Sequence, residues 1–349
     1  MRIKRLWTLF VARNREFLRD RAAFGWNFLF PFLIIGGFGL IFGSDRYAEY
    51  KVGVFPVATE NAAPATLDIP EPFRQTRYIQ FVGFKTADEA FDKLKHYKID
   101  FLIKAGPPPY AYWLNTTSPK GYFVEKIFQS SLLPPDLSLP ARKNEISGRQ
   151  IRYVDWFFPG ILTMNMMFSA LWGVGYVVVR YRKNGVLKRL KATPLTAFEY
   201  LSAQMLSRIF LLMFTLAVVW IGCDLIFTFH VEGSYLDLAI VFFVGSLSLT
   251  ALGLVIAARG TSEEFATGLL NFIAWPMMFL SEVWFSIEGA PQWVKNMAAV
   301  FPLTHLLKAV RKIMNDGAGL IDVGPELAVL ALMTLAFLAI GAWLFSWNR

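Results

Sequence analysis

The sequence predicts an α-helical membrane protein with six transmembrane helices, an N-terminal interfacial helix and a small mixed α/β extracytoplasmic domain between helices 1 and 2. The first observation is composition: the 349 residues are 55% hydrophobic and only 17% charged, which is more apolar than an ordinary soluble domain. The second is a series of apolar runs of about 20 residues, the length that crosses the hydrocarbon core of a bilayer. The third is a long polar stretch between the first two runs.

Residues 1–22 are expected to form an interfacial helix on the cytoplasmic surface of the membrane. Apolar residues recur there at helical spacing and alternate with basic residues, which suits an anionic leaflet. The apolar set is Leu6, Trp7, Phe10, Val11, Phe17 and Leu18. A frayed basic tail is the alternative. The first transmembrane helix is predicted to follow at 23–43.

Six apolar runs predict the transmembrane helices. Four carry no charged residue: 24–42, 156–179, 238–258 and 327–347. The run 201–229 contains Arg208 and Asp224 near its two ends, where we expect the side chains to snorkel to the interface. The run 265–287 contains Pro276 and Glu282, and Glu282 is expected at the outer end of this helix.

Basic residues gather on one side of the predicted helices. They precede the first run, follow the second in 180–191, follow the fourth at Arg259 and end the chain at Arg349. Since short cytoplasmic loops are enriched in Lys and Arg, both termini are expected to be cytoplasmic, with the protein in the cell inner membrane. One group falls on the predicted outer side and argues the other way: Lys295, Lys308, Arg311 and Lys312.

Residues 44–150 predict the extracytoplasmic α/β domain, and 151–349 the remaining helices. Strands are expected at 51–57, 78–84, 99–104 and 110–114. Thr86-Ala-Asp-Glu89 has the pattern of a capping box that opens a helix. A second helix is expected near 121–131, and the proline-rich segment 132–147 is expected to be an irregular connector.

The sequence argues against several functional classes. No G-x-x-x-x-G-K-[ST] phosphate-binding loop occurs, so no ATPase site of that kind is expected. The histidines His96, His230 and His305 lie far apart, and the single Cys223 excludes an intramolecular disulfide or a cysteine metal site. Basic residues that flank apolar runs argue against a nucleic-acid partner. We therefore expect no catalytic residue, no metal and no cofactor in this chain.

The stretch RYRKNGVLKRLKATPL at 180–195 contains six basic residues and no acid. Its minimal role is to fix the orientation of the chain. Asn184-Gly185 also predicts a turn, Val186, Leu187 and Leu190 can share one face of a short helix within 184–194, and Pro194 stops that helix after Thr193. Such an amphipathic helix between two transmembrane helices is suited to docking another protein.

Residues 185–195 are similar to the G-T-L-x-x-L-x-x-T-P-L element of the membrane subunits of type 2 ABC exporters. The segment YVDWFFPGI at 153–161 resembles the entry to the second helix of that family. The region from Pro291-Gln-Trp293 through FPLTH at 301–305 to Arg311 resembles its segment of short re-entrant helices, which implies a re-entrant outer segment at 283–325. The resemblance extends over about the whole chain.

This resemblance implies the permease subunit of an ATP-driven exporter that moves a hydrophobic or amphipathic substrate, such as a drug, a lipid or a glycan-like molecule. It implies a separate ABC ATPase subunit that binds ATP and Mg²⁺, a second permease chain in a homodimer or heterodimer, and contact with membrane lipids. A periplasmic adaptor is a further candidate partner of the outer domain. The residues implied in coupling to the ATPase are Gly185, Val186, Leu187, Leu190, Thr193 and Pro194.

The resemblance also places the substrate path at the permease dimer interface, lined mainly by helices two and five. The candidate path residues are Thr163, Asn165, Met167, Asn271 and Trp275. For the Asn and Thr residues the alternative is hydrogen bonding between helices, and for the apolar residues it is a surface that faces lipid.

The basic segment departs from the family pattern, because Val186 stands in place of Thr, and Lys183 and Lys188 stand where acids are common. A basic docking helix predicts an acidic groove on the partner ATPase. An alternative function is a non-transporting membrane subunit, which would relay ATPase motion to the extracytoplasmic domain and regulate an envelope process.

Overall fold

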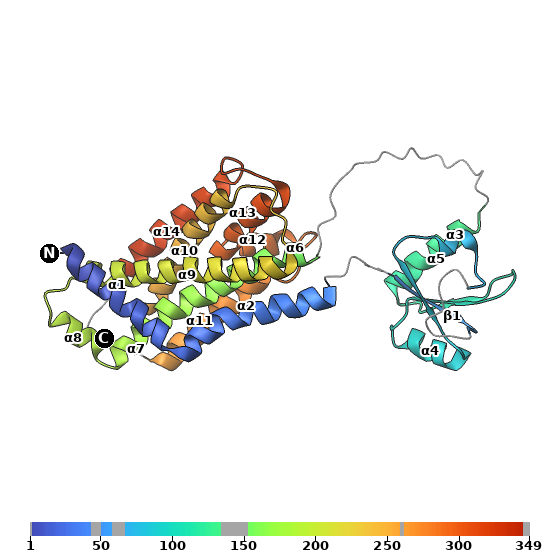
Figure 1. Ribbon diagram of the computed structural model, residues 1–349, viewed down its shortest axis with the longest axis horizontal. Coiled ribbons are helices and arrows are strands. Elements are labelled where there is room, and N and C mark those ends of the chain that lie inside the picture. The colour runs from blue at the N-terminus through green and yellow to red at the C-terminus, as the bar shows by residue number, and fades with distance from the viewer. Residues whose placement is uncertain (1, 43–49, 58–66, 134–152, 259–261, 345–349) are drawn as a thin grey trace. The chain divides into compact units, whose positions relative to one another are not determined.

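The computed structural model describes residues 2–42, 50–57, 67–133, 153–258 and 262–344, which belong to two compact units (Figure 1). One unit combines Met1–Gly43 with Arg149–Arg349, and the other is Ser44–Gly148. Most of the predicted connector 132–147 lies outside the described residues, as do Arg259 and Arg349, which contributed to the predicted orientation.

The smaller unit is built on a four-stranded sheet in the order β2-β1-β3-β4. Strand β1 (Tyr50–Phe55) runs parallel to both β2 (Ile79–Gly83) and β3 (Phe101–Lys104), and β4 (Tyr112–Leu114) is antiparallel to β3. The four strands lie close to the ranges expected from the sequence. A mixed α/β fold is therefore present in this unit.

Helices cover both faces of this sheet. Helices α3 (Glu71–Arg74) and α5 (Pro119–Ser131) lie on one face, and α4 (Ala87–Lys95) lies on the other (Figure 1). Because neighbouring side chains of a strand point to opposite faces, Phe101 packs into the core under α5 whereas Leu102 packs into the core under α4. Each face thus has its own apolar core.

The two longer helices of this unit begin at side-chain caps. The Thr86 hydroxyl accepts a hydrogen bond from the backbone N–H of Glu89 (3.5 Å), which confirms the predicted start of α4. The Ser118 hydroxyl accepts in the same way from Gly121 N–H (3.0 Å) at the start of α5. Such caps satisfy N–H groups that have no partner inside the helix.

The helical unit begins with α1 (Arg2–Arg19) and α2 (Arg21–Phe42), which are bent by 61° at the break between them. A helix is therefore present over most of 1–22. Part of its surface packs on α9 (Ala197–Phe227), where the Ser207 hydroxyl donates to the amide oxygen of the buried Asn14 (3.1 Å). Protein contacts, and not lipid alone, hold this helix.

By length and composition, four helical segments of the described chain can span a membrane, or five if the bent α1–α2 pair is one span. They are Val154–Lys183, α9, α10 (Tyr235–Ala257) and α14 (Gly324–Leu344). The predicted helix 265–287 is shorter than expected. Helix α11 (Glu263–Leu280) ends because Glu282 takes a φ of +63°, a left-handed conformation that α-helices do not contain.

The predicted helix 156–179 is not a uniform α-helix. Helix α6 (Tyr153–Ala170) continues into a π-helical segment, η2 (Leu171–Tyr176), and then into α7 (Val177–Lys183) and the short α8 (Val186–Lys191). A π-turn replaces the usual backbone hydrogen bonds with longer-range ones. It therefore leaves room for side chains of other helices to reach its carbonyl groups.

Small residues let α10 approach this π-helical segment closely. A Cβ atom at Gly253 would lie 3.2 Å from the backbone oxygen of Ala170, and Ala257 is fully buried. Gly253 and Ala257 thus allow close helix packing, a role of small residues that is common in membrane helices.

Two short helices, α12 (Gln292–Ala298) and α13 (Pro302–Asp316), connect α11 to α14. The basic residues of α13 that argued against the predicted orientation are paired with acids. Lys308 and Lys312 both contact the buried Glu326 at the start of α14 (3.2 and 2.9 Å), and Arg311 pairs with Glu282 (3.6 Å). Because these charges are compensated, they carry less weight as topology signals than free lysines would.

Gly160 provides a test of how closely α6 packs against the segment that follows α11. A Cβ atom there would lie 2.8 Å from the backbone oxygen of Val283, so the backbone must move to admit it. We expect Gly160→Ala to lower the stability of the full chain by about 1–3 kcal/mol, as overpacking does. The measurement is the midpoint of thermal unfolding in detergent.

Gly268→Ala is the matched control, because Gly268 lies in α11 and a Cβ atom added to it would have no neighbour within 4 Å. Alanine favours helix over glycine, so this variant should unfold at the wild-type temperature or above it. Equal midpoints for Gly160→Ala and wild type would contradict the packing described.

Candidate functional site

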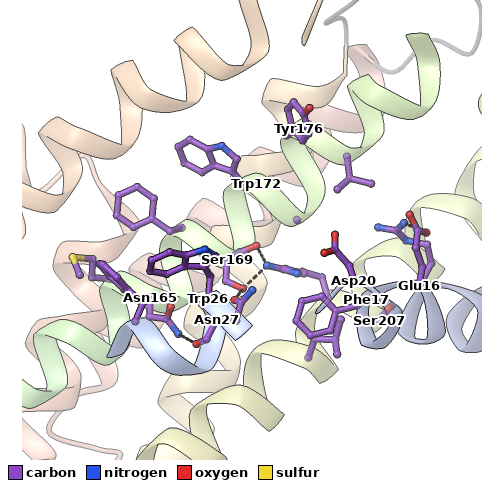
Figure 2. Close-up of a pocket in the computed structure, with 18 of the residues that line it drawn as sticks. Glu16, Phe17, Asp20, Trp26, Asn27, Asn165, Ser169, Trp172, Tyr176 and Ser207 are labelled. Carbon is purple, nitrogen blue, oxygen red and sulfur yellow. Dashed lines mark hydrogen bonds and ion pairs between the residues drawn. The ribbon is translucent and has the colours of Figure 1, made fainter. Parts of the chain in front are cut away.

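A cavity of about 700 Å³ lies among α1, α2, α6, η2, α7, α9 and α11 (Figure 2). Its surface is mainly apolar and rich in aromatic rings, and polar and charged side chains from several helices also line it. The aromatic residues on the wall include Phe17, Trp26, Phe30, Phe168, Trp172 and Trp275. A largely apolar cavity with a few converging polar groups is the usual form of a small-molecule site.

The structure brings two of the five candidate path residues to this cavity. Asn165 of α6 and Trp275 of α11 line it. Thr163 is buried and its hydroxyl donates to a carbonyl of its own helix (2.9 Å), while Met167 is fully buried in the core. Asn271 is half-buried and lies outside the cavity lining.

Helix α2 contributes a polar residue, Asn27, that the sequence did not single out. The Asn165 amide donates to the backbone oxygen of Asn27 (3.3 Å). The Ser169 hydroxyl donates to the amide oxygen of Asn27 (2.7 Å), and all three residues line the cavity (Figure 2). Asn165 therefore combines the two roles considered for it, on a cavity wall and in a hydrogen bond between helices.

Arg208 corrects another expectation. Its side chain does not snorkel to an interface; it is buried, and it donates to both the backbone oxygen and the hydroxyl of Ser169. A Cβ atom at Gly173 would overlap its guanidinium. Gly173 in η2 thus leaves the space that the buried guanidinium occupies. This contact joins distant segments, so the sequence of α9 alone does not reveal it.

The short helix α8 begins after Gly185, whose φ of +69° requires a residue tolerant of the left-handed region. The predicted turn and helix are present. Its apolar face, however, packs inward: Leu187 is fully buried beside Val178, Leu201 and Leu254. Leu187 is therefore unavailable to a partner, because it fills a space among α7, α9 and α10.

The opposite side of this region is accessible. Lys188, Arg189, Thr193 and Pro194 are exposed, and Arg5 of α1 donates a hydrogen bond to the backbone oxygen of Pro194. The two remaining apolar residues of the predicted face, Val186 and Leu190, line a second cavity of about 390 Å³ beside α1. The surface that a partner could touch here is thus basic.

Charged side chains tie this end of the bundle to neighbouring helices. Arg182 is buried and donates to the backbone oxygens of Ala257 (2.9 Å) and Ala258 (3.0 Å) at the end of α10. Lys183 pairs with Glu263 at the start of α11 (3.4 Å). The hydroxyl of Tyr176 donates to Glu263 (2.6 Å), so two residues of this region contact the same carboxyl group.

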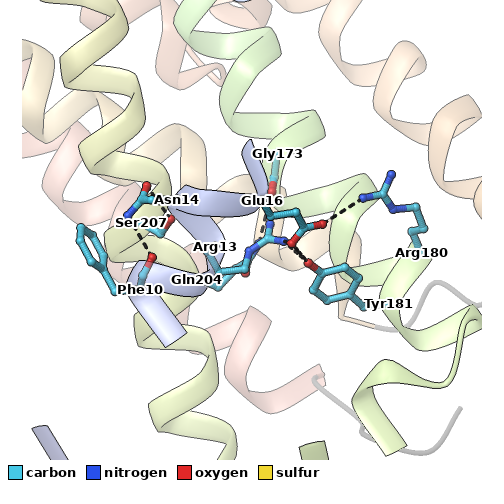
Figure 3. Close-up of polar contacts among 9 residues, drawn as sticks. All are labelled: Phe10, Arg13, Asn14, Glu16, Gly173, Arg180, Tyr181, Gln204 and Ser207. Atoms are coloured by element: carbon cyan, nitrogen blue, oxygen red, sulfur yellow. Dashed lines mark hydrogen bonds and ion pairs between the residues drawn. The ribbon is translucent and has the colours of Figure 1, made fainter. Parts of the chain in front are cut away.

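The same region is tied to α1 (Figure 3). Glu16 pairs with Arg13 (2.7 Å) and with Arg180 (3.4 Å), and the hydroxyl of Tyr181 donates to Glu16. The Arg13 guanidinium also lies 4.9 Å from the centre of the Tyr181 ring. Since Arg13, Glu16 and Arg180 also line the large cavity, the contacts that hold α7 and α8 continue into its wall.

Comparison with known proteins identifies a family with these features. The model of a family described as ABC-2 family transporter protein matches residues 22–343. The daunorubicin resistance ABC transporter permease protein DrrB1 of Streptomyces coeruleorubidus is 23% identical over 189 residues. The inner membrane transport permease YhhJ of Escherichia coli is 24% identical over 192 residues.

These matches cover only part of each protein. The alignment with DrrB1 takes 53% of this chain and 66% of that protein, and the alignment with YhhJ takes 53% and 50%. ABC transporter G family member 20 of Dictyostelium discoideum is 26% identical over 173 residues, which is 48% of this chain and 23% of that protein. The chain thus matches two thirds or less of the length of these relatives.

The Arg182 contacts provide a test. Replacing Arg182 with Met leaves the last carbonyls of α10 without their side-chain donors, and hydrogen bonds from charged groups contribute about 1.5–3 kcal/mol each. We expect a clear fall in the thermal unfolding midpoint of Arg182→Met. The control is Arg189→Met, which removes an equivalent but exposed arginine and should shift it little. Similar midpoints for the two variants would show that Arg182 does not hold α10.

Proposed function

This chain belongs to the ABC-2 family of transporter proteins, and from this premise we propose that it is the permease subunit of an ATP-driven exporter of hydrophobic or amphipathic molecules. The cavity among α2, α6, α9 and α11 carries the proposal. Its volume and aromatic wall suit a molecule with a substantial apolar part, and apolar contact with rings is non-directional, so different cargoes fit.

In this proposal a separate ABC ATPase subunit binds ATP and Mg²⁺ and docks on the α8 region. The sequence contains no phosphate-binding loop of its own. The exposed basic residues Lys188 and Arg189, together with Thr193 and Pro194, form the docking surface, whereas Leu187 holds α8 to the bundle. This revises the docking surface expected from the sequence, because contact is made by the basic face and not by the apolar one.

The proposed topology has six transmembrane segments, with both termini in the cytoplasm of a cell with an inner membrane. Length and composition support four segments, or five if the bent α1–α2 pair is one span. We assign α11 as the sixth, because the 16 residues that follow Glu264 in it are uncharged. This arrangement places α8 on the cytoplasmic side, where an ATPase would be, and Ser44–Gly148 outside. There this unit is free to contact a periplasmic adaptor.

We further propose that two permease chains pair, and that ATP-driven closure of the ATPase subunits moves α8. A push on α8 reaches α7, α9 and α10 through the buried Leu187, and α7 in turn contacts α10 through Arg182 and α11 through Lys183. Because η2, α7 and α11 contribute to the cavity wall, a rigid-body shift of this kind changes the shape of the cavity.

Transport in proteoliposomes tests this function. The permease, co-expressed and purified with the ATPase that associates with it, should move a fluorescent hydrophobic dye across the membrane when ATP and Mg²⁺ are present. The catalytically inactive ATPase provides the control. ATP hydrolysis with no movement of dyes of different charge would favour the non-transporting alternative instead.

The docking surface has its own test. The triple variant Lys188→Glu, Arg189→Glu, Lys191→Glu should reduce co-purification of the ATPase at least tenfold, since like charges across an interface disfavour association. Its thermal stability should be unchanged.

The matched control reverses the charge of three lysines in the α/β unit: Lys95, Lys98 and Lys104. These are exposed, and their replacement by Glu changes the net charge by the same amount without touching α8. Undiminished co-purification of the α8 triple variant would exclude this docking surface.

A further inference from the structure

Arg208 faces the large cavity, and no carboxylate among the described residues forms an ion pair with it. Arg208 is 8% exposed and lines the cavity, and it lies within α9, a segment able to span a membrane. A buried charge in such a helix is costly unless another group compensates it. The groups around Arg208 therefore decide whether its charge is compensated within this chain.

Its known contacts are all with neutral groups. One terminal nitrogen of the guanidinium donates to the backbone oxygen and the hydroxyl of Ser169, and the ring of Phe17 lies 6.0 Å from its central carbon. Its Nε–H is buried and has no hydrogen-bond partner among the described residues. The donors of this guanidinium are thus only partly used.

The acids of the cavity do not neutralise it. Glu16 and Asp20 line the same cavity (Figure 2), but Glu16 is engaged by Arg13 and Arg180. In the part of the chain that the structure describes, neither carboxylate forms an ion pair with Arg208. Three arginines and two acids line the cavity, so its charged wall has an excess of positive charge.

The guanidinium is held in place and does not simply fill a gap. Its hydrogen bonds to Ser169 fix one terminal nitrogen, and Gly173 of η2 provides the space beside it. An arginine fixed in this way is pre-organised to pair with an anion, because little side-chain freedom is lost on binding.

We propose that the cavity selects amphipathic anions, with the apolar body of the ligand among the aromatic rings and its sulfonate, carboxylate or phosphate paired with Arg208. This inference rests on the proposed function and specifies its substrate class. The aromatic rings of Trp26, Trp172 and Trp275 provide affinity for the body, and Arg208 provides the preference for negative charge.

Two fluorescent probes with the same aromatic body test this selection. 8-Anilino-1-naphthalenesulfonate carries a sulfonate, and N-phenyl-1-naphthylamine is its neutral counterpart. Each is titrated into the full chain in nanodiscs of zwitterionic lipid, with empty nanodiscs subtracted, and energy transfer from the cavity tryptophans reports binding. We expect the protein to bind the sulfonate about tenfold more tightly than the neutral probe, as one charge-assisted contact provides.

Arg208→Met should abolish this preference while leaving the affinity for the neutral probe within about twofold, because the apolar wall is retained. Arg208→Lys should keep part of it. Arg15→Met is the matched control: Arg15 is exposed on α1 outside the cavity, so the loss of its charge should leave the preference intact. If Arg208→Met does not fold, Gly173→Ala displaces the guanidinium and should weaken the preference.

Nanodiscs containing phosphatidylglycerol distinguish two sources of such an anion. The sulfonate affinity of wild type and of Arg208→Met is compared between zwitterionic and phosphatidylglycerol nanodiscs. If phosphatidylglycerol lowers the affinity of wild type more than that of Arg208→Met, a lipid headgroup occupies the site. If the preference of wild type for the sulfonate is unchanged, the site takes a solute. Equal wild-type affinities for the two probes, or a preference that survives in Arg208→Met, would overturn the proposal. Because no ATPase is needed, this result is independent of whether the complex transports dye.

Discussion

The two hydrogen bonds from Arg182 to the end of α10 show the constraint on which this bundle depends. Backbone groups inside an apolar assembly have no water to bind, so their partners must come from other helices. At the end of the bundle that contains α7, Arg182 is this partner for two carbonyl groups at the end of α10. Side-chain pairs add to it: Lys183 joins α7 to Glu263 of α11, and Arg180 joins it to Glu16 of α1. The buried Leu187 in turn packs α8 against α7, α9 and α10, so α8 is not an independent appendage.

The large cavity follows from a second departure from regular helix. The π-helical segment η2 combines a backbone that admits side-chain donors with two glycines that leave space beside it. Arg208 and Gln204 of α9 occupy that region and donate to Ser169 and Gly173. Polar groups of α6 and α9 thereby meet at a cavity that is also lined by aromatic rings. A site that joins apolar contact with one fixed positive charge can be both broad in shape preference and selective for charge.

Much of the architecture could be predicted from the sequence, because it depends on local patterns. Apolar runs mark the long helices, Thr86 marks the start of α4, and Gly185 marks the turn before α8. What could not be predicted depends on contacts between distant segments. The π-turn at Leu171, the inward position of Arg208 and the burial of Leu187 are each decided by a neighbouring helix. For the same reason only Asn165 and Trp275 of the five candidate path residues reach the cavity.

If movement of α8 reshapes the cavity, the distance between α2 and α11 across it changes, and measuring that distance is the most direct test. Spin labels at Leu29→Cys of α2 and Phe272→Cys of α11, both exposed positions, are introduced with Cys223→Ser and diluted with unlabelled chains to remove distances between permeases. In the complex with the ATPase, double electron–electron resonance should show that the distribution of distances between the two labels shifts when ATP is added. An unchanged distribution while the complex hydrolyses ATP would contradict the account.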